Sequence, residues 1–485
     1  MSHVDVTRDD DKPKEECGVF GAVSANREVA RLTFFALCAI QHRGQESAGI
    51  AVSDDGHVMV QRDLGLVTDV FDEPALRTLT GNMAIGHVRY STTGANKWDN
   101  AQPVIRTRGD GLIALGHNGN LTNTSQLRKE LGGKGLELSA TTDSELIAAT
   151  IAEAEGTLLE AVATAMPRLR GAFSVVVMSS DELVAFRDSY GVRPLVLGRL
   201  PEGGWCVASE TCAFDQIGAL FEREVLPGEA IRITADGVES IQAMPQAGHK
   251  LCIFETIYFA RPDSIMEGQA MWDARHAMGM RLAEEAPVEA DLVVGLPDSG
   301  TPAAIGFANA SGIPYGEAVV RSRYVGRTFI QPEQDQRRTS VRRKFNPLPS
   351  IITGKRLVVV DDSIVRGTTT QEIISMLRAA GAAEIHLRIS SPPIMWPCYY
   401  GIDMATRDEL IGANNTVEEI CRHVGATSLA YISLEGLQVA LGRPANRFCR
   451  ACFTGEYPTP VPGEALKLSF EGGTVQAGQT VRETV

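Results

Sequence analysis

Two adjacent aspartates, Asp361 and Asp362, follow a short apolar run and precede a turn of small residues. The run from 357 to 370 reads LVVVDDSIVRGTTT, and its four leading apolar residues are typical of a parallel strand buried on both faces. Open α/β sheets bind ligands at the carboxyl ends of such strands. Because carboxylates suit a magnesium ion or sugar hydroxyls rather than phosphates, the pair predicts a metal-assisted sugar site.

The residues after the aspartates have the composition of a phosphate-binding turn. Free amides at a helix N-terminus and small hydroxyl side chains hold phosphates well, and a helical pattern, QEIISMLRAAG, runs on to Gly381. An ordinary capped turn is the alternative, but the order of strand, acid pair and Gly-Thr turn favours a phosphorylated sugar with a metal ion. No Walker-type GxxxxGK[ST] motif occurs in the sequence. The expected ligand-binding residues are Asp361, Asp362, Ser363, Arg366, Gly367, Thr368 and Thr369.

A second turn of small residues, PDSGTPAA at 297–304, lies between a predicted strand at 291–296 and a predicted helix at 302–310. Taken alone, a helix N-cap from Ser299 or Thr301 is the simpler interpretation. The same composition also suits a diphosphate or a metal ion. We therefore keep Ser299, Gly300 and Thr301 as candidate ligand-binding residues.

A basic run lies between these two turns, at residues 321–347. Solvated loops and nucleic-acid patches both have such charge, but a net charge of −14 argues against nucleic acid and anionic membranes. A mobile flap that orders over a highly anionic substrate and excludes water fits better. Five of its positive charges fall within eight residues: Arg337, Arg338, Arg342, Arg343 and Lys344.

Cys17 follows a polar leader in the sequence EECGVFG. A buried structural thiol is one interpretation. The other is removal of residues 1–16, which would make Cys17 the amino terminus. A free α-amine has a pKa of about 7.7–8.0 and could accept the proton of the thiol, whose reference pKa is about 8.5. One residue would then supply both nucleophile and base.

The chain has 485 residues, 44% hydrophobic and 22% charged, which indicates two or three globular domains. Many short strand patterns and two helical stretches, at 29–40 and 144–155, predict an α+β first part. After about residue 251 the pattern becomes α/β. We expect a propeptide at 1–16, a first domain at 17–250, a second at 251–465 and a tail at 466–485. No apolar run has the length of a membrane span and the leader is polar, so we expect a cytoplasmic location.

Nine cysteines do not resemble a secreted disulfide framework. A lone CxxC, such as Cys449 and Cys452, indicates metal, redox chemistry or nothing. Four cysteines in one domain raise the odds of metal ligation, and their spacing does not separate zinc from iron–sulfur. The four candidates are Cys252, Cys398, Cys449 and Cys452.

The ordered motifs resemble two known families. The run at 357–370 resembles the signature of type I phosphoribosyltransferases, which bind 5-phosphoribosyl pyrophosphate (PRPP). CGVFG, QHRGQESAGI, GHVRYSTTG, GHNGNLTN and TDSE, in that order, resemble amino-terminal-nucleophile (Ntn) glutamine amidotransferases. Nearly the whole chain resembles the glutamine phosphoribosylpyrophosphate amidotransferases. The resemblance implies an α+β Ntn-hydrolase αββα sandwich, followed by an α/β type I phosphoribosyltransferase domain with a parallel sheet.

The resemblance also implies roles in glutamine hydrolysis. Cys17 would be the nucleophile, and the Asn118 side chain and Gly119 amide, on a turn after a strand, would form the oxyanion hole. Arg89, assisted by Thr92, would bind the substrate carboxylate and Asp143 the substrate ammonium.

On the PRPP side, the resemblance places the 5-phosphate on the Gly-Thr loop and the pyrophosphate beside residues 297–304. Mg²⁺ would be bound by Ser299, Asp361 and Asp362, and the segments YVGRTFI and SVRRK, which includes Lys344, match the family's flap. One branch of the family carries a cleaved propeptide and a 4Fe–4S cluster on four cysteines in these contexts. The family also implies a homotetramer inhibited by purine nucleotides.

The implied reaction uses glutamine, PRPP and water to make 5-phosphoribosylamine, the committed step of purine synthesis. Three rivals remain at this point. A hexosamine-forming amidotransferase would lack DDSIVRGTT, and a PRPP-binding regulator would not need Cys17 with Arg89 and Asp143. A nucleic-acid-binding protein would contradict the net charge.

Overall fold

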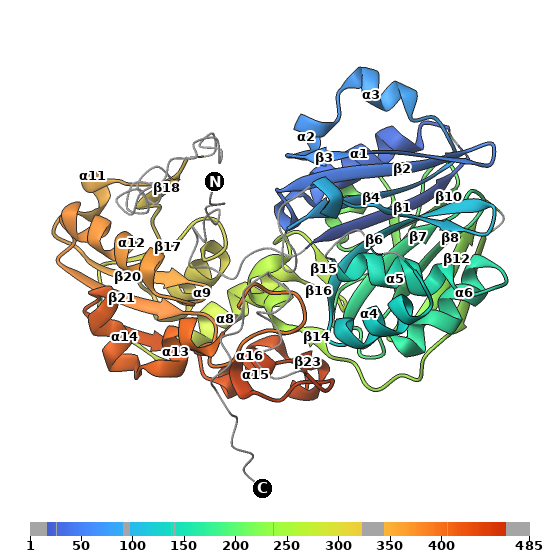
Figure 1. The fold of residues 1–485 in the computed structure, drawn as a ribbon. Coiled ribbons are helices and arrows are strands. Elements are labelled where there is room, and N and C mark those ends of the chain that lie inside the picture. The colour runs from blue at the N-terminus through green and yellow to red at the C-terminus, as the bar shows by residue number, and fades with distance from the viewer. Residues whose placement is uncertain are drawn as a thin grey trace, which may run out of the picture.

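The computed structural model describes residues 17–25, 27–90, 98–136, 138, 142–235, 237–322, 344–404 and 406–461. The predicted propeptide, Thr92, the tail at 466–485 and the basic run from 323 to 343 lie outside these ranges. The described chain forms two bodies, with the N-terminal one built mainly of strands and the second containing a smaller sheet (Figure 1).

The first body begins with a seven-stranded antiparallel sheet whose two faces pack against different partners. Along its central strand, Phe20 and Ala22 pack against helices, whereas Val19 and Val23 face the second sheet. This alternation follows from the two-residue period of a strand. Helices α1 (Val29–Ala39) and α7 (Cys212–Ile217) cover the outer face. The strand order is β11 (Leu220–Glu224), β9 (Val196–Arg199), β10 (Gly204–Ala208), β1 (Gly18–Ser24), β4 (Met83–Arg89), β2 (Ser47–Asp54) and β3 (His57–Leu64).

A six-stranded antiparallel sheet faces the first sheet across a shared apolar core. Its outer face is covered by α5 (Asp143–Ala152) and α6 (Leu158–Ala165), and α4 (Thr124–Gly133) packs beside α5. The result is the predicted αββα sandwich, which is thereby confirmed. The strand order is β13 (Gly237–Gln242), β12 (Glu229–Thr234), β8 (Leu183–Arg187), β7 (Gly171–Met178), β6 (Gly111–Leu121) and β5 (Val104–Arg108).

The second body contains the predicted parallel sheet. Val358 and Val360 pack on one side of it and Leu357 and Val359 on the other, so the apolar run is buried on both faces. Helices α8 (Met271–Glu285) and α9 (Thr301–Ser311) belong to the first side, and α12 (Thr368–Ala379) and α14 (Val417–Val424) to the second. The strand order is β17 (Leu292–Gly295), β20 (Arg356–Asp361), β21 (Glu384–Ile389) and β22 (Ser428–Tyr431).

Two distant segments pair where the bodies meet. Strand β14 (Leu251–Cys252) runs parallel to β23 (Phe448–Cys449), and a π-helix, η4 (Glu255–Phe259), follows β14. Strand β13 ends at Gln242 and β14 begins at Leu251, while the boundary at residue 250 stays a prediction.

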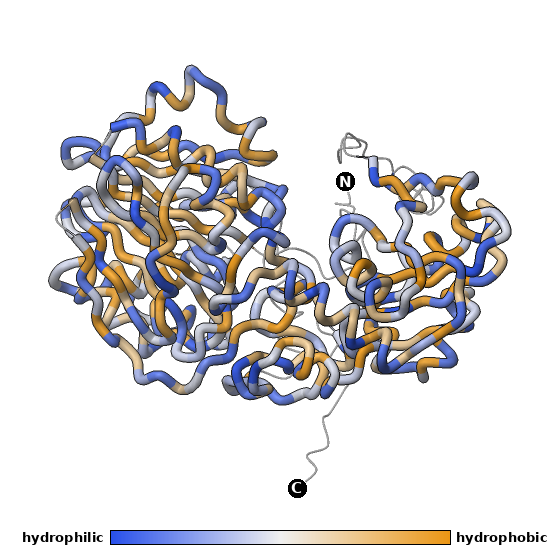
Figure 2. Tube along the Cα trace, turned by 180° about the vertical axis from the view of Figure 1, so that it is seen from behind, coloured by the Kyte–Doolittle hydropathy of each residue, from blue (hydrophilic) through white to orange (hydrophobic). Residues whose placement is uncertain are grey.

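Apolar residues concentrate in the strands of both bodies, with polar residues on the outer loops (Figure 2). Within the described ranges, no helix is both long and apolar enough to cross a bilayer.

Candidate active sites

Cys17 lies directly before β1 and is buried in the first body. Because β1 pairs with β4, the thiol lies near the end of β4, and its Sγ donates a hydrogen bond to the Tyr90 carbonyl at 3.4 Å. Burial raises the pKa of Cys17 to about 11, against the lowering effects of the Tyr90 hydrogen bond and the Arg89 charge. Such a thiol is protonated at neutral pH and needs a base before it can act as a nucleophile.

Asn118 and Gly119 lie within β6 rather than on a turn after it, so that part of the prediction is wrong. Both residues pair with β7, opposite Ser174 and Phe173. The Asn118 side chain is buried, and neither its Oδ1 nor its Nδ2 has a hydrogen-bond partner among the described residues. A buried amide without partners is costly, so Asn118 is available to a ligand.

Gly119 must be glycine at its place in β6. Its φ is +141°, and a Cβ atom there would lie 2.1 Å from the Ala172 carbonyl oxygen. Because Gly119 has no side chain, its backbone lies closer to β7 than that of any other residue could.

Asp143 begins α5, with its carboxylate buried beside β6. Its Oδ2 accepts a hydrogen bond from the Leu121 amide at 2.9 Å, and Oδ1 lies 3.7 Å from His117 Nδ1. Burial raises the pKa of Asp143, but the His117 ring and the hydrogen bonds lower it by more, so the pKa lies below its ordinary value. The site therefore holds a buried anion. His117 precedes Asn118 in GHNGN and is buried.

Arg89 ends β4 and is buried, which places its cation in the same region as the thiol and Asp143. His87, two residues earlier, has a hydrogen bond of 3.0 Å between its Nε2 and the His117 carbonyl. Burial lowers the pKa of His87 to about 3, so this ring is neutral and donates that bond. The structure thus brings Cys17, Arg89 and Asp143 together, and it buries Asn118 on strand β6. Thr92 lies outside the described residues.

The second site forms at the carboxyl end of β20. Asp361 and Asp362 are buried, and Ser299, from the turn after β17, donates from its Oγ to Asp362 Oδ2 at 2.5 Å. Gly300 allows this approach, since a Cβ atom there would lie 2.6 Å from the Val360 carbonyl oxygen. Ser363 donates to the other oxygen of Asp362, at 2.6 Å. A carboxylate pair and a hydroxyl are oxygen ligands of the kind that Mg²⁺ prefers.

The Gly-Thr turn leads directly into α12. Gly367 has a φ of +85° and caps the helix, which begins at Thr368, three residues before the helix predicted from Gln371. The amides of Thr368 and Thr369 therefore belong to a helix N-terminus, as the phosphate interpretation needs. Arg366 is held by an ion pair of 2.7 Å between its Nη2 and Glu409 Oε2. Glu409 gave no signal in the sequence.

The base of the basic run lies beside the turn after β17. Strands β18 (Val319–Arg321) and β19 (Phe345–Pro347) pair there, and the Lys344 carbonyl accepts a hydrogen bond from the Ser322 amide at 2.8 Å. Arg321 Nη1 binds Asp298 Oδ2 at 2.8 Å. Lys344 thus sits at the base of the predicted flap. The other four cations of its eight-residue cluster, at 337–343, lie outside the described residues.

The four candidate cysteines gather around one small buried cavity, which Tyr400 and Tyr457 also line. Cys252 lies opposite Cys449 in the backbone pairing of β14 with β23. Burial raises the pKa of Cys252 to about 12, with the nearby Arg193 opposing the shift, and raises the pKa of Cys449 to about 12 as well. With such raised pKa values, these buried thiols lose their protons only when a metal cation binds in place of the protons.

A larger cavity of about 740 Å³ lies elsewhere, along residues 224–227 and 246–249. Ligand atoms of Glu224, His249 and Glu267 lie within 4.8 Å of one another there. Arg443 and Arg447 already pair with Glu267. Their charges oppose a metal cation, so we assign no metal site to this group.

Comparisons with known proteins agree along both bodies. Residues 87–216 match a glutamine amidotransferase domain, and residues 263–390 match a phosphoribosyl transferase domain. An amidophosphoribosyltransferase of Synechococcus elongatus is 50% identical over 473 residues, which cover 96% of this chain and 96% of that protein. One of Mycobacterium tuberculosis is 52% identical, covering 94% of this chain and 89% of its own length.

Two solved structures are similar over nearly the whole chain. One is a glutamine PRPP amidotransferase from B. subtilis complexed with ADP and GMP, with 44% identity, a TM-score of 0.87, and coverage of 92% of this chain and 98% of that one. The other is described as the allosteric regulatory enzyme of purine biosynthesis, with 43% identity, a TM-score of 0.89, and coverage of 94% and 99%.

Proposed function

The chain belongs to the amidophosphoribosyltransferase family, and from this premise we propose how its residues divide the reaction between the two bodies. It is a glutamine-dependent pentosyltransferase of the first step of purine biosynthesis. Nitrogen from glutamine replaces the pyrophosphate of PRPP and gives 5-phosphoribosylamine. The phosphoribosyl transferase domain excludes a hexosamine-forming enzyme, which would not contain one.

Glutamine hydrolysis is assigned to the first body. The Cys17 thiol loses its proton to the α-amine that cleavage of residues 1–16 exposes, and the sulfur attacks the side-chain amide carbon. The negative oxygen of the tetrahedral intermediate accepts hydrogen bonds from Asn118 Nδ2 and the Gly119 amide. Ammonia leaves, and water hydrolyses the thioester to glutamate. The unpartnered Asn118 amide and the raised Cys17 pKa support this assignment.

Recognition of the amino-acid end of glutamine is assigned to two buried charges. The Arg89 guanidinium binds the substrate carboxylate through its planar fork, with help from Thr92. The Asp143 carboxylate binds the substrate ammonium. Its depressed pKa supports this role, because the group stays an anion throughout the neutral range.

Phosphoribosyl transfer is assigned to the second body. Amides of Gly367, Thr368 and Thr369 hold the 5-phosphate at the start of α12. Asp361, Asp362 and Ser299 would hold Mg²⁺, which supplies positive charge to the departing pyrophosphate. Ammonia attacks the anomeric carbon as the bond to pyrophosphate breaks, and the added nitrogen then loses a proton. Lys344 and the flap exclude water, which would otherwise compete with ammonia. The remaining assigned contacts to PRPP are Ser363, Arg366, Gly300 and Thr301.

Cys252, Cys398, Cys449 and Cys452 are assigned to a 4Fe–4S cluster. A zinc ion with Zn–S bonds of about 2.3 Å needs its sulfurs within about 4 Å of one another. Within the described chain, the groups that bring three ligand atoms within 4.8 Å do not include these cysteines. Their wider spacing around a shared cavity supports a larger, polynuclear group, to which we give a structural role.

Four further assignments follow the family. A propeptide at 1–16 is supported by the need of Cys17 for a base. Inhibition by purine nucleotides is supported by the ADP and GMP in the similar B. subtilis structure. The nine cysteines form no disulfide bonds with one another, as is typical of a reducing cytoplasm. We also propose that this protein is a homotetramer, as the family implies.

The observation that carries the proposal is the presence, in one chain, of a buried thiol, a buried amide without hydrogen-bond partners and an acid pair at a sheet edge. Glutamine labelled with ¹⁵N in its amide group tests it. The label should appear in the ribosyl product, and a product without label would contradict the proposal. The intact mass of the purified protein tests the cleavage before Cys17.

A further inference from the structure

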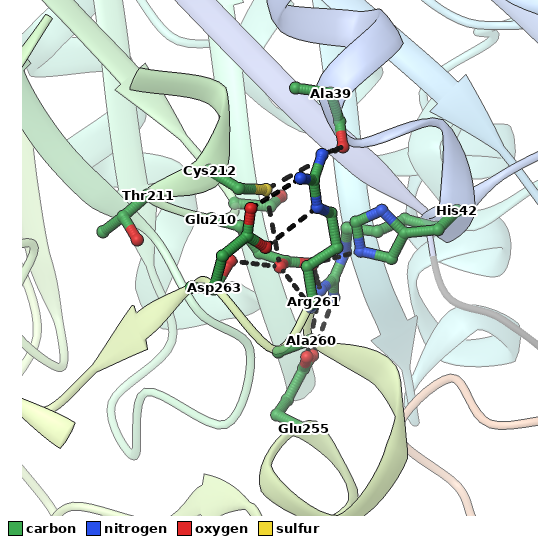
Figure 3. Close-up of polar contacts among 12 residues, drawn as sticks. Ala39, His42, Glu210, Thr211, Cys212, Glu255, Ala260, Arg261 and Asp263 are labelled. Carbon is green, nitrogen blue, oxygen red and sulfur yellow. Dashed lines mark hydrogen bonds and ion pairs between the residues drawn. The ribbon is translucent and has the colours of Figure 1, made fainter. Parts of the chain in front are cut away.

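A group of buried charges joins the two bodies (Figure 3). One of these charges, Arg43, contacts the Cys17 carbonyl. The side chains of Arg43, Glu210 and Glu255 have no solvent exposure at all. Arg43 and Glu210 belong to the first body, whereas Glu255 belongs to the π-helix η4 at the start of the second. Buried ions require partners, so each of these contacts constrains how the bodies meet.

Arg43 uses all three of its guanidinium nitrogens. Its Nε donates to the Cys17 carbonyl at 3.1 Å. Its Nη2 donates to Glu255 Oε1 at 2.7 Å, and Nη1 donates to Glu255 Oε2 at 3.0 Å and to Glu210 Oε1 at 2.6 Å. The two-pronged contact with Glu255 fixes the plane of the guanidinium, and that plane fixes the direction of the bond to Cys17.

Glu210 connects to the second body through its other oxygen. Its Oε2 accepts hydrogen bonds from the Arg261 amide at 2.8 Å and from Ser264 Oγ at 2.6 Å. His42 Nε2 lies 2.7 Å from Glu210 Oε1. Glu210 therefore still neutralises Arg43 and holds the two bodies together when the charge of Glu255 is removed.

Arg43 and Glu210 stay ionised at neutral pH. Burial lowers the pKa of Arg43, but the Glu255 and Glu210 charges raise it above its ordinary value. Burial likewise raises the pKa of Glu210, and the neighbouring His42 and Arg43 bring it below its ordinary value.

The helix that carries Glu255 is itself anchored in the second body. Arg275, on α8, donates to the Thr256 and Ala260 carbonyls at 2.8 and 2.7 Å. Burial lowers the pKa of Arg275 to about 10, and the Asp362 carboxylate is the main opposing charge. A path of contacts therefore runs from Arg275 of α8 through η4, Glu255 and Arg43 to Cys17.

We propose that Glu255 is a positioning residue for glutamine hydrolysis, and that it acts by holding Arg43 against the Cys17 carbonyl. The second body thereby sets the orientation of a nucleophile that lies in the first. This inference rests on the proposed role of Cys17. Glu255 touches neither glutamine nor PRPP, so its effect falls on the turnover of bound glutamine and not on its binding.

The variant Glu255→Gln tests this role, because it keeps the shape and removes the charge. We expect kcat for glutamine hydrolysis to fall about 10- to 100-fold, the size of effect that misplacement of a reacting group by 1 Å produces. KM for glutamine should change less than about twofold, and ammonia-dependent formation of phosphoribosylamine should keep its rate. An unchanged kcat, or an equal loss of the ammonia-dependent reaction, would overturn the proposal. Glu285→Gln, which removes a half-buried carboxylate from α8 of the same body, is the matched control and should leave all three quantities unchanged.

A double variant separates positioning from simple docking. If Glu255 acts through Arg43, Glu255→Gln should cause no further loss of kcat in an Arg43→Met background. If the two losses of kcat multiplied in the double variant, Glu255 would act by another route, and the proposal would be overturned.

Labelling with a diazoketone analogue of glutamine distinguishes the two levels of inference. The wild-type enzyme should be alkylated at Cys17, and Glu255→Gln should react about 10- to 100-fold more slowly, in parallel with its kcat. Equal rates would refute only the positioning role. Absence of label on Cys17 of the wild type would refute the nucleophile on which that role rests.

Discussion

The two reaction centres are built by different means. In the first body, the thiol, the guanidinium and the proposed oxyanion-hole residues all lie in or beside hydrogen-bonded strands, at Cys17, Arg89, Asn118 and Gly119. In the second body, the acid pair and hydroxyls lie on turns that follow strands, and a basic segment adjoins them.

This difference matches the two chemistries. An oxyanion hole works only if its donors hold their positions before charge develops, and the pairing of β6 with β7 would hold the proposed donors, Asn118 and Gly119, in place. A polyanion with a metal ion needs many oxygen and nitrogen contacts from several directions, which turns at a sheet edge supply more readily than strands do.

The division of roles between the two bodies is tested most strongly at Cys17, the proposed nucleophile. Cys17→Ala should reduce glutamine-dependent activity by about 10,000-fold or more, since no other group on the strand framework replaces the thiol. Ammonia-dependent synthesis should persist, because it needs only the second body. Assays of both reactions decide the matter, with Cys206→Ala, a buried thiol of the same body, as the matched control. Equal loss of both activities would refute the division of roles.

The reciprocal experiment addresses the acid pair. Asp361→Asn should lower PRPP turnover by about 1,000-fold by weakening the oxygen ligands of the metal, while glutaminase activity survives. Pyrophosphate release with ammonia as nitrogen donor is the measurement. Asp291→Asn, on an exposed carboxylate at the opposite end of the same sheet, should have little effect.

A rigid oxyanion hole predicts a specific kinetic signature. Asn118→Ala should lower kcat for glutamine hydrolysis by about 100- to 1,000-fold, the usual cost of one missing donor, with little change in KM. If KM rose and kcat stayed constant, Asn118 would be a binding residue and not part of the oxyanion hole.

The proposed cluster site would add a third kind of construction, in which the bound group is part of the fold. The purified protein should be brown and contain about four iron atoms per chain. Cys449→Ser should lose iron and colour together and give less folded protein, measured by iron assay and visible absorbance. A colourless protein that contains zinc would correct the cluster assignment.

The smallest effect concerns stability of the first body in acid. His87 has a folded pKa of about 3, below its ordinary value of about 6.5, so the unfolded chain binds a proton that the native chain does not. Between these two pH values, this residue should lower the free energy of unfolding by up to about 1.4 kcal/mol for each unit that pH falls. Above pH 6.5 it should have no effect. His87→Gln should flatten this part of the curve in denaturant titrations, and an unchanged slope would contradict it.

Sequence reasoning predicted those parts of the fold whose signal is local. The apolar run before Asp361 became a buried parallel strand, and alternating runs such as residues 18–23 became strands of the sandwich. Strands β11 and β13 were missed because their polar sequences, LFERE and GVESIQ, lie at sheet edges, where little apolar surface is needed.

The errors at the candidate sites also have physical causes. Asn118 and Gly119 have low strand propensity, so a turn was predicted, yet pairing of β6 with β7 keeps them in the strand. Arg43 and Glu255 stand 212 positions apart, and no local pattern indicates a contact at that separation. Tertiary structure alone brings such partners together.

The parallel pairing of β14 with β23 has a consequence for biosynthesis. One strand opens the second body and the other lies close to its end, so their two cysteines leave the ribosome far apart in time. In the proposed cluster, all four sulfur ligands are present only once the chain has been synthesised beyond Cys452. A truncated chain that stops before Cys449 would lack half of these ligands.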